Sequence, residues 1–203
     1  MAGELEDIGT KLREERDRIG ISQRELARRI GLSASMISQI ESGQSKPSVS
    51  TLYAIVTELG VSVDDIFSGA NGVAQEQGAP GGPAPSRATH HGPLVRLEDR
   101  HVIELDSQVR WERLTSHQHE DVDFLEVVYD VGGASASDEK MMRHPGREYG
   151  LVLEGQLGVL LGFDRYSLGP GDSIAFDSTQ PHRLWNEGDV PVRGIWFVVG
   201  RAG

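Results

Sequence analysis

The chain has 203 residues, of which 37% are hydrophobic, enough for one large domain or two small ones with ordinary apolar cores. It has no cysteine, which excludes disulfides, zinc-thiolate sites and thiol nucleophiles, so any metal must be held by histidine and carboxylate side chains. The net charge of -11 is uneven, with 4 Lys or Arg against 2 Asp or Glu in residues 21–47 and 12 against 20 in residues 70–203, which excludes indiscriminate binding to nucleic acid and leaves a compact, specific contact possible.

Three regions follow one another, which predicts an α + β protein of two domains. Residues 4–69 carry apolar residues at helical spacing with Ser or Gly between them, which indicates a bundle of short helices. Residues 70–93 are too poor in apolar side chains to order, so we expect a flexible linker. Residues 94–200 alternate β-branched and aromatic runs with turn residues, which is typical of an antiparallel sandwich or barrel. Because no apolar run approaches the roughly 18 residues of a membrane span, we expect a cytoplasmic protein without a membrane partner.

Residues 23–42, QRELARRIGLSASMISQIES, have the spacing of two short helices joined by a tight turn. Ala27 is small where the helices would approach, and Gly31 suits a positive φ in the turn. Ser22 and Ser33 stand where N-caps are needed. The second helix would then bury its isoleucines and leave short or amide side chains on the opposite face, which suit base edges in a major groove.

The phrases ISQRELA, GLS, ISQIESG and KPS make residues 8–67 resemble the phage-repressor and Cro type of helix-turn-helix, the XRE family. The resemblance implies an all-α bundle of five helices that binds a double-stranded DNA operator as a homodimer. The DNA-contacting residues that we expect are Gln23, Arg24, Ser33, Ala34, Ser35, Ser38, Gln39 and Lys46. The alternative is a helical hairpin used only for packing or dimerisation.

A histidine and a glutamate stand four residues apart in HPGREYGLVLEG, residues 144–155. A straight strand would separate His144 and Glu148 by about 13 Å, but Pro145 and Gly146 form a turn dipeptide that can bring them together. His182 follows a proline at the start of another apolar strand. Two histidines and one carboxylate are a ligand set suited to Fe²⁺, and Mn²⁺ or Zn²⁺ are also possible.

These two segments resemble the two motifs of the cupin family, an all-β double-stranded β-helix barrel. The matching residues are Glu-x6-Gly at residues 148–155 and Gly-Asp…Pro-His-x3-Asn at residues 171–186. Many cupins carry a further histidine at the position of Met142, so the resemblance here implies three metal ligands, His144, Glu148 and His182. The alternative is that these side chains line a cavity and bind an organic ligand directly, with Arg147, Tyr149 and Trp185 as further pocket candidates.

A second cluster of histidines and acids, HQHEDVD at residues 117–123, has no Glu-x6-Gly strand after it and is therefore interpreted as an acidic surface loop. The leading hypothesis for function is a transcriptional regulator, not an enzyme, whose cupin domain binds a small-molecule effector, a divalent metal or both and so alters operator affinity. The alternative is a mononuclear-metal cupin oxygenase, because the same domain order resembles the hydroxypropylphosphonate epoxidases. Against the enzyme, the helix-turn-helix keeps capped helices and a polar face.

Overall fold

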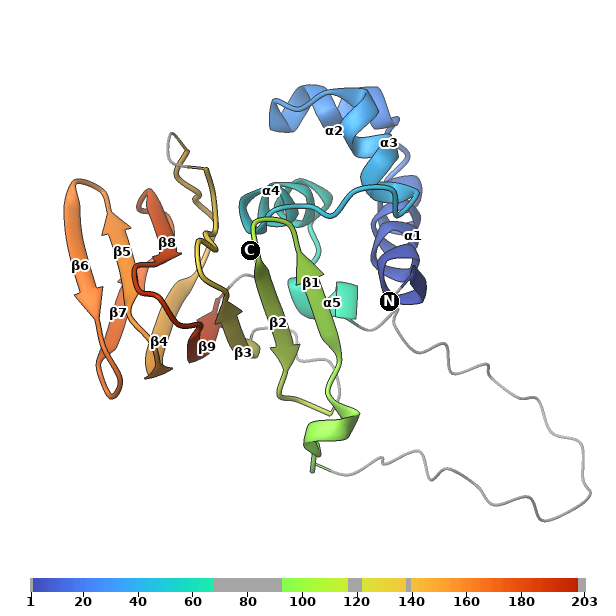
Figure 1. Cartoon of the computed structure of the whole chain (residues 1–203). Helices are drawn as coiled ribbons and strands as arrows, with labels where there is room; N and C mark the ends of the chain where they lie inside the picture. The colour runs from blue at the N-terminus through green and yellow to red at the C-terminus, as the bar shows by residue number, and fades with distance from the viewer. Residues whose placement is uncertain (1, 68–92, 117–121, 138–139, 201–203) are drawn as a thin grey trace, which may run out of the picture.

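A computed structural model describes residues 2–67, 93–116, 122–137 and 140–200, with side chains from Ile8 onward (Figure 1). The described residues form five α-helices and nine strands, as the predicted fold class requires. The helices are α1 (Ala2–Arg18), α2 (Gln23–Ile30), α3 (Ala34–Glu41), α4 (Val49–Leu59) and α5 (Val63–Phe67). The strands are β1 (Val102–Leu105), β2 (Val109–Arg113), β3 (Val122–Tyr129), β4 (Arg147–Glu154), β5 (Leu157–Leu161), β6 (Asp164–Leu168), β7 (Ser173–Asp177), β8 (His182–Asn186) and β9 (Val192–Val199). The predicted linker, except Pro93, and residues 117–121 of the acidic cluster lie outside the described residues.

The predicted helix-turn-helix is formed by α2 and α3. The Ser22 hydroxyl accepts a hydrogen bond from the Glu25 N–H and the Ser33 hydroxyl accepts one from the Met36 N–H, each at 3.1 Å. Gly31 ends α2 with φ of 70°, a left-handed conformation that favours glycine. Both predicted caps and the predicted turn are therefore confirmed.

A buried ion pair holds α1 against α3. Arg16 donates from Nε to Oε1 of Glu41 at 2.6 Å and from a terminal nitrogen to Oε2 at 3.0 Å. Gln23, at the start of α2, donates to the same Oε2 at 2.8 Å. Three helices therefore meet at one carboxylate, beside a core that includes Leu26, Ile37 and Ile40.

The strands form two antiparallel sheets, in the orders β1-β2-β3-β9-β4-β7 and β6-β5-β8. Buried residues of both sheets, among them Val152 and Val198 of the larger and Val159 and Leu184 of the smaller, belong to one hydrophobic core. β6, the sequence DRYSL, was not among the predicted apolar runs because only its last residue is buried. The predicted cupin fold is confirmed, and β6 and β7 are the free edges between the two sheets.

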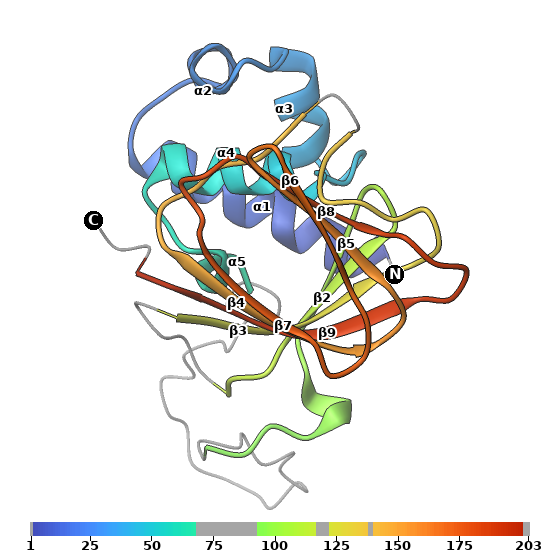
Figure 2. The same ribbon diagram turned by 90° about the vertical axis from the view of Figure 1, so that its left-hand side faces the viewer.

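The helical domain packs directly on the first strands of the cupin domain. α4 and α5 face the strands, whereas α2 and α3 lie on the far side of the helical domain (Figures 1 and 2). The Asp106 N–H donates to the Pro47 carbonyl at 2.9 Å, and Arg113 approaches Asp64 to 3.5 Å with both side chains buried. The apolar cores of the two domains are continuous. The sequence analysis predicted the two domains but not this direct contact between them.

Candidate metal centre and DNA-binding face

The exposed side of α3 carries Ser35, Ser38 and Gln39, as predicted, and Arg24 of α2 is exposed near the start of the motif. Ile37 and Ile40 fix this orientation because they are buried in the helical core on the opposite side of α3. Met36, which is not among the predicted DNA contacts, is also exposed, at 42%. The arrangement offers hydroxyl, amide and thioether groups on one face of a helix.

Four of the other predicted DNA contacts are engaged within the protein. Ala34 is half-buried and packs against the helical core, and Gln23 donates to Glu41. Lys46 points to the cupin domain, where its ammonium lies 2.6 Å from a carboxylate oxygen of Glu104. Ser33 stays exposed, but its hydroxyl oxygen caps α3. Ala34, Gln23 and Lys46 therefore have contacts within the protein, and their role in DNA binding stays a prediction.

Charge on this face is partly neutralised by local pairs. Glu25 accepts hydrogen bonds from Arg28 and Arg29, at 2.7 Å from each, and these two guanidinium groups lower the pKa of Glu25 to about 2. Arg29 also pairs with Glu58 at 2.9 Å. The net positive potential available to phosphate is consequently smaller than a count of arginines suggests.

His144, Glu148 and His182 converge as the sequence predicted. Gly146, with φ of 108°, turns the chain so that Nε2 of His144 lies 2.9 Å from Oε1 of Glu148. Nε2 of His182 lies 3.1 Å from the same oxygen. The side chains are 0%, 3% and 0% exposed, so the cluster is sealed from solvent.

The protonation pattern of this cluster fits a bound cation. Nδ1 of His144 is 3.1 Å from the Pro145 carbonyl and Nδ1 of His182 is 2.8 Å from the Gln180 carbonyl, and since a carbonyl only accepts, each Nδ1 carries the proton. A neutral imidazole then directs an Nε2 lone pair at Glu148. Within the described residues, neither Nε2 nor Oε1 of Glu148 has a partner in hydrogen-bonding geometry. Three buried acceptors that face one another are stabilised by a metal ion between them.

Trp196 of β9 binds the carboxylate of Glu148 on the side away from the histidines. Its indole Nε1 donates to Oε2 of Glu148 at 2.7 Å, which leaves Oε1 directed at the imidazoles. Trp196 was missed because it lies 48 residues from Glu148 in sequence and belongs to neither motif.

An aromatic ring packs against each histidine. The Tyr53 ring of α4 is stacked on His144, with 4.0 Å between centroids and 8° between planes. Phe176 of β7 contacts His182 at 5.1 Å. Tyr53 is the only one of these residues that comes from the helical domain, and no local pattern around it marks a cupin site.

The further pocket candidates are placed elsewhere, and the structure corrects them. Side chains alternate along β4, so burial of Glu148 leaves Arg147 and Tyr149 on the outer, exposed face of the sheet. Trp185 of β8 packs over Gly158, where a Cβ would lie 2.1 Å from the indole. Arg165 and Arg183 lie over the same indole ring.

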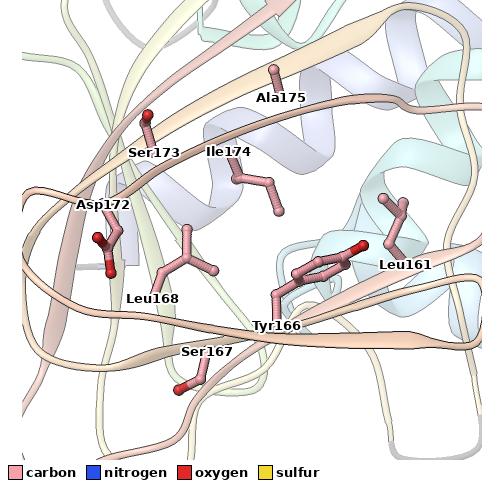
Figure 3. A pocket seen from close by; sticks show the side chains of 8 residues that line it. All are labelled: Leu161, Tyr166, Ser167, Leu168, Asp172, Ser173, Ile174 and Ala175. Atoms are coloured by element: carbon pink, nitrogen blue, oxygen red, sulfur yellow. The ribbon is translucent and has the colours of Figure 1, made fainter.

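A pocket of about 470 Å³ opens between the free edges β6 and β7. Figure 3 shows Tyr166 and Leu168 directed from one strand toward Ile174 on the other. It is lined by Leu161, Tyr166, Ser167, Leu168, Asp172, Ser173, Ile174 and Ala175. The histidine cluster does not line it, but Leu161 is the register partner of His182, and Ile174 stands two residues before Phe176.

Comparison with known proteins agrees with both halves of this description. Residues 12–66 match the helix-turn-helix family HTH_3, and residues 125–198 match the cupin domain family Cupin_2. The chain therefore carries a helix-turn-helix domain of the HTH_3 family followed by a cupin domain of the Cupin_2 family. It is similar to the HTH-type transcriptional regulator PuuR of Escherichia coli, with 29% identity over 88% of this chain and 86% of that protein.

A solved structure shows the same fold. A crystal structure of an HTH_3 family transcriptional regulator from Vibrio cholerae has a TM-score of 0.68, with 20% identity over 98% of each chain. Hydroxypropylphosphonic acid epoxidase from S. wedmorenis covers 98% of this chain and 100% of its own at a TM-score of 0.43 and 17% identity, too little similarity to support a shared reaction. Among the described helices, none has both the length and the apolarity that crossing a bilayer requires.

Proposed function

We propose that this protein is a sequence-specific regulator of transcription whose cupin domain binds a divalent metal and a small-molecule effector. The observation that carries the DNA-binding part is the exposed Ser35, Ser38 and Gln39 face of α3, whose N-cap is the predicted Ser33. The similarity to PuuR supports the same conclusion. DNA binding also requires the protein to share the compartment of the chromosome, which supports a cytoplasmic location.

The DNA-binding face is tested with sequences that the protein itself selects from a random duplex library. Gln39→Ala should reduce discrimination against mismatched sites by about 1–3 kcal/mol, because an amide can form a bidentate contact with a base edge. Arg24→Ala should weaken binding to all sequences alike, since a phosphate contact carries no sequence information. Arg96→Ala, an exposed arginine of the cupin domain, is the matched control. Equal, sequence-independent losses for Gln39→Ala and Arg24→Ala would contradict the assigned face.

We further propose that the regulator is a homodimer joined through the outer face of the larger sheet. Tyr149, Phe197 and Phe124 are register partners across three strands, and Phe197 and Phe124 are stacked at 4.3 Å. Leu151 and Leu153 extend this face, at 40% and 39% exposure. Arg193, paired with Glu126 and Glu154, gives it a charged rim. An apolar centre with a polar rim suits a second copy of the same surface, because an isologous contact pairs the patch with itself.

Leu151→Glu should convert the dimer to a monomer, because it places two unpaired carboxylates in an apolar contact. Phe163→Glu is the matched control, since Phe163 is fully exposed in the turn after β5. Light scattering after gel filtration measures the mass of each variant. A dimeric Leu151→Glu would place the contact elsewhere, and a monomeric wild-type would contradict dimerisation itself.

For the metal, the three acceptors support Fe²⁺, Mn²⁺ or Zn²⁺ at His144, Glu148 and His182. For the organic effector, we propose the pocket between β6 and β7, whose volume falls within the range of small-molecule sites. Ile174→Trp should fill this pocket and abolish the effector's influence on DNA affinity while metal binding is retained. Mass spectrometry of small molecules that copurify with the wild-type and with this variant would identify the effector; identical molecules in both would contradict the pocket.

The second candidate function is a mononuclear-metal oxygenase, and the His144, Glu148 and His182 triad is the observation that favours it. The residues resemble a facial ligand set, in which an open position accepts oxygen or substrate. We expect no oxygen consumption above the His182→Ala background when Fe²⁺-loaded protein is mixed with hydroxypropylphosphonate. Consumption that depends on His182 would establish the enzyme instead.

A further inference from the structure

The metal centre is walled on one side by the other domain. Tyr53 of α4 is 3% exposed and lies parallel to the imidazole of His144, one of the three acceptor side chains. The edge of Trp111 in β2 holds the Tyr53 ring from another direction, with 5.5 Å between centroids and 62° between planes. A helix of the DNA-binding domain therefore reaches a ligand of the cupin site through a single aromatic ring.

The two histidines are held differently, because His182 belongs to a strand and His144 does not. His182 begins β8, exchanges backbone hydrogen bonds with Met142 at 2.9 and 3.0 Å, and is a register partner of Leu161. His144 lies outside the strands, where its N–H donates to the Ser178 carbonyl at 3.1 Å and its Nδ1 lies against the Pro145 carbonyl. Each imidazole has one hydrogen bond on its Nδ1 side, which leaves it free to rotate about that bond, and the parallel Tyr53 ring in contact with the face of His144 blocks this rotation.

A second connection links the start of α4 to the strand of His182. The Ser50 N–H donates to the Ser135 carbonyl at 3.0 Å. The Ser135 hydroxyl accepts from the Leu184 N–H on β8, also at 3.0 Å, and the Ser135 N–H donates to the Leu184 carbonyl at 2.8 Å. Both histidines are therefore connected to the same helix, His144 by ring stacking and His182 through its strand.

We infer that Tyr53 is a positioning residue of the cupin metal centre, supplied by the DNA-binding domain, and that the centre has its full affinity only while α4 is docked. The inference rests on the proposed metal-binding function. Thermodynamic linkage makes the relation reciprocal, so a bound ion stabilises the docked position of α4 by the same factor. Because α3 is packed in the same helical core as α4, ion occupancy then sets the orientation of the DNA-binding face relative to the cupin domain.

Co²⁺ is the probe, because its visible spectrum reports the geometry of histidine ligands. Tyr53→Ala should weaken Co²⁺ binding by about 10–100-fold, the usual loss when an outer-shell partner of a ligand is removed, and should change the spectrum. Tyr53→Phe keeps the ring and should match the wild-type in both. Val56→Ala removes buried apolar groups from the same helix, so it should lower the melting temperature without changing Co²⁺ affinity or spectrum.

A covalent lock tests the docking requirement without altering Tyr53. The chain has no cysteine, so Lys46→Cys with Glu104→Cys can be joined across the domain contact by a short bis-maleimide. The crosslink should slow the loss of Co²⁺ to a chelator at least tenfold relative to the same variant before crosslinking. In the unmodified chain, Co²⁺ should slow hydrogen exchange of the α4 amides.

Three results would overturn the inference. The first is a Tyr53→Ala variant that binds Co²⁺ with wild-type affinity and spectrum. The second is a rate of Co²⁺ loss that the crosslink does not change, and the third is a hydrogen-exchange rate of the α4 amides that Co²⁺ does not change. If Tyr53→Ala does not fold, the crosslink and exchange measurements decide alone. Wild-type protein that binds no Co²⁺ is a different outcome, because it refutes the proposed metal centre itself and the role of Tyr53 with it.

Discussion

The two candidate sites of this protein use polar groups in opposite ways. On α3, Ser35, Ser38 and Gln39 stand in water, so their hydrogen-bonding capacity stays satisfied until DNA replaces the solvent. In the cupin domain, His144, Glu148 and His182 are sealed from water with three acceptor atoms facing one another. The first arrangement costs little in the absence of a partner, whereas the second is destabilising unless a cation is present.

This difference indicates how each site should respond to mutation. An open face loses individual contacts one at a time, so effects on DNA recognition should be modest and separable. A buried cluster whose members share one ion should fail as a unit, because each ligand orients the others.

The largest effect is expected for His182→Ala, which should reduce Zn²⁺ affinity by more than about 100-fold, a greater loss than for an outer-shell residue. The variant should keep the DNA affinity of metal-free protein, because none of the three cluster residues lies in α2 or α3. Calorimetric titration measures the metal, and gel shift measures the DNA. Gln180→Ala is the control, since it leaves the backbone carbonyl that accepts from His182. Unchanged Zn²⁺ affinity in His182→Ala would leave the buried cluster without a metal role.

A smaller loss, about 10–100-fold in Zn²⁺ affinity, is expected for Trp196→Phe, which removes the N–H donated to Glu148 but keeps most of the ring. Trp185→Phe provides the comparison, because that indole lies over Gly158 away from the cluster. The same titration applies. Equal losses in both variants would mean that general destabilisation, and not the hydrogen bond, explains the result.

On the open side, Ser33→Ala should lower the free energy of unfolding by about 1 kcal/mol, because α3 loses its N-cap. Ser35→Ala, two residues on and exposed, should leave stability unchanged while it reduces sequence discrimination. Urea unfolding measures stability. A large stability loss for Ser35→Ala would show that this face is packed against something and not free for DNA.

The smallest effect concerns pH. Burial raises the pKa of Glu126, but hydrogen bonds from Arg193 and Arg100 outweigh burial and leave that pKa below its ordinary value. The stabilisation of the folded state by ionised Glu126 is thus complete above the unfolded pKa of about 4.3, and it is lost as pH falls through the pKa of Glu126 in the folded protein. Glu126→Gln should flatten this acid-side loss, measured as melting temperature against pH. Glu25→Gln should change it little, because that carboxylate is exposed and screened by solvent.

Local patterns predicted the features that local physics determines. Ser22, Gly31 and Ser33 were assigned correctly because a cap or a turn depends on a few consecutive residues. The convergence of His144 and Glu148 followed from one turn dipeptide in the same way. The triad was complete only because a family motif also supplied His182, which no spacing argument connects to the other two.

Features that depend on tertiary contacts were missed or misplaced. The direction of Lys46 is set by Glu104 in the other domain, and the outward direction of Tyr149 follows from the strand register at Glu148. Ala34 was assigned to the exposed face although it is half-buried. Near the start of a helix, a small error in the expected helix position changes which face a side chain lies on. Trp196 and Tyr53 reach the cluster from distant segments, and the sequence offers no signal that joins them to it.

The continuous core between the domains has a consequence for synthesis of the chain. Tyr53 and the rest of α4 are made well before Trp111 and His144, against which the tyrosine packs. At the ribosome's rate of about 5–20 residues per second, the helical segment therefore waits on the order of seconds with its strand-facing side uncovered. During that interval the nascent chain displays an apolar surface that invites chaperones or neighbouring nascent chains. Translation speed across residues 68–144 should thus influence the yield of folded protein more than speed in the segment that follows β8.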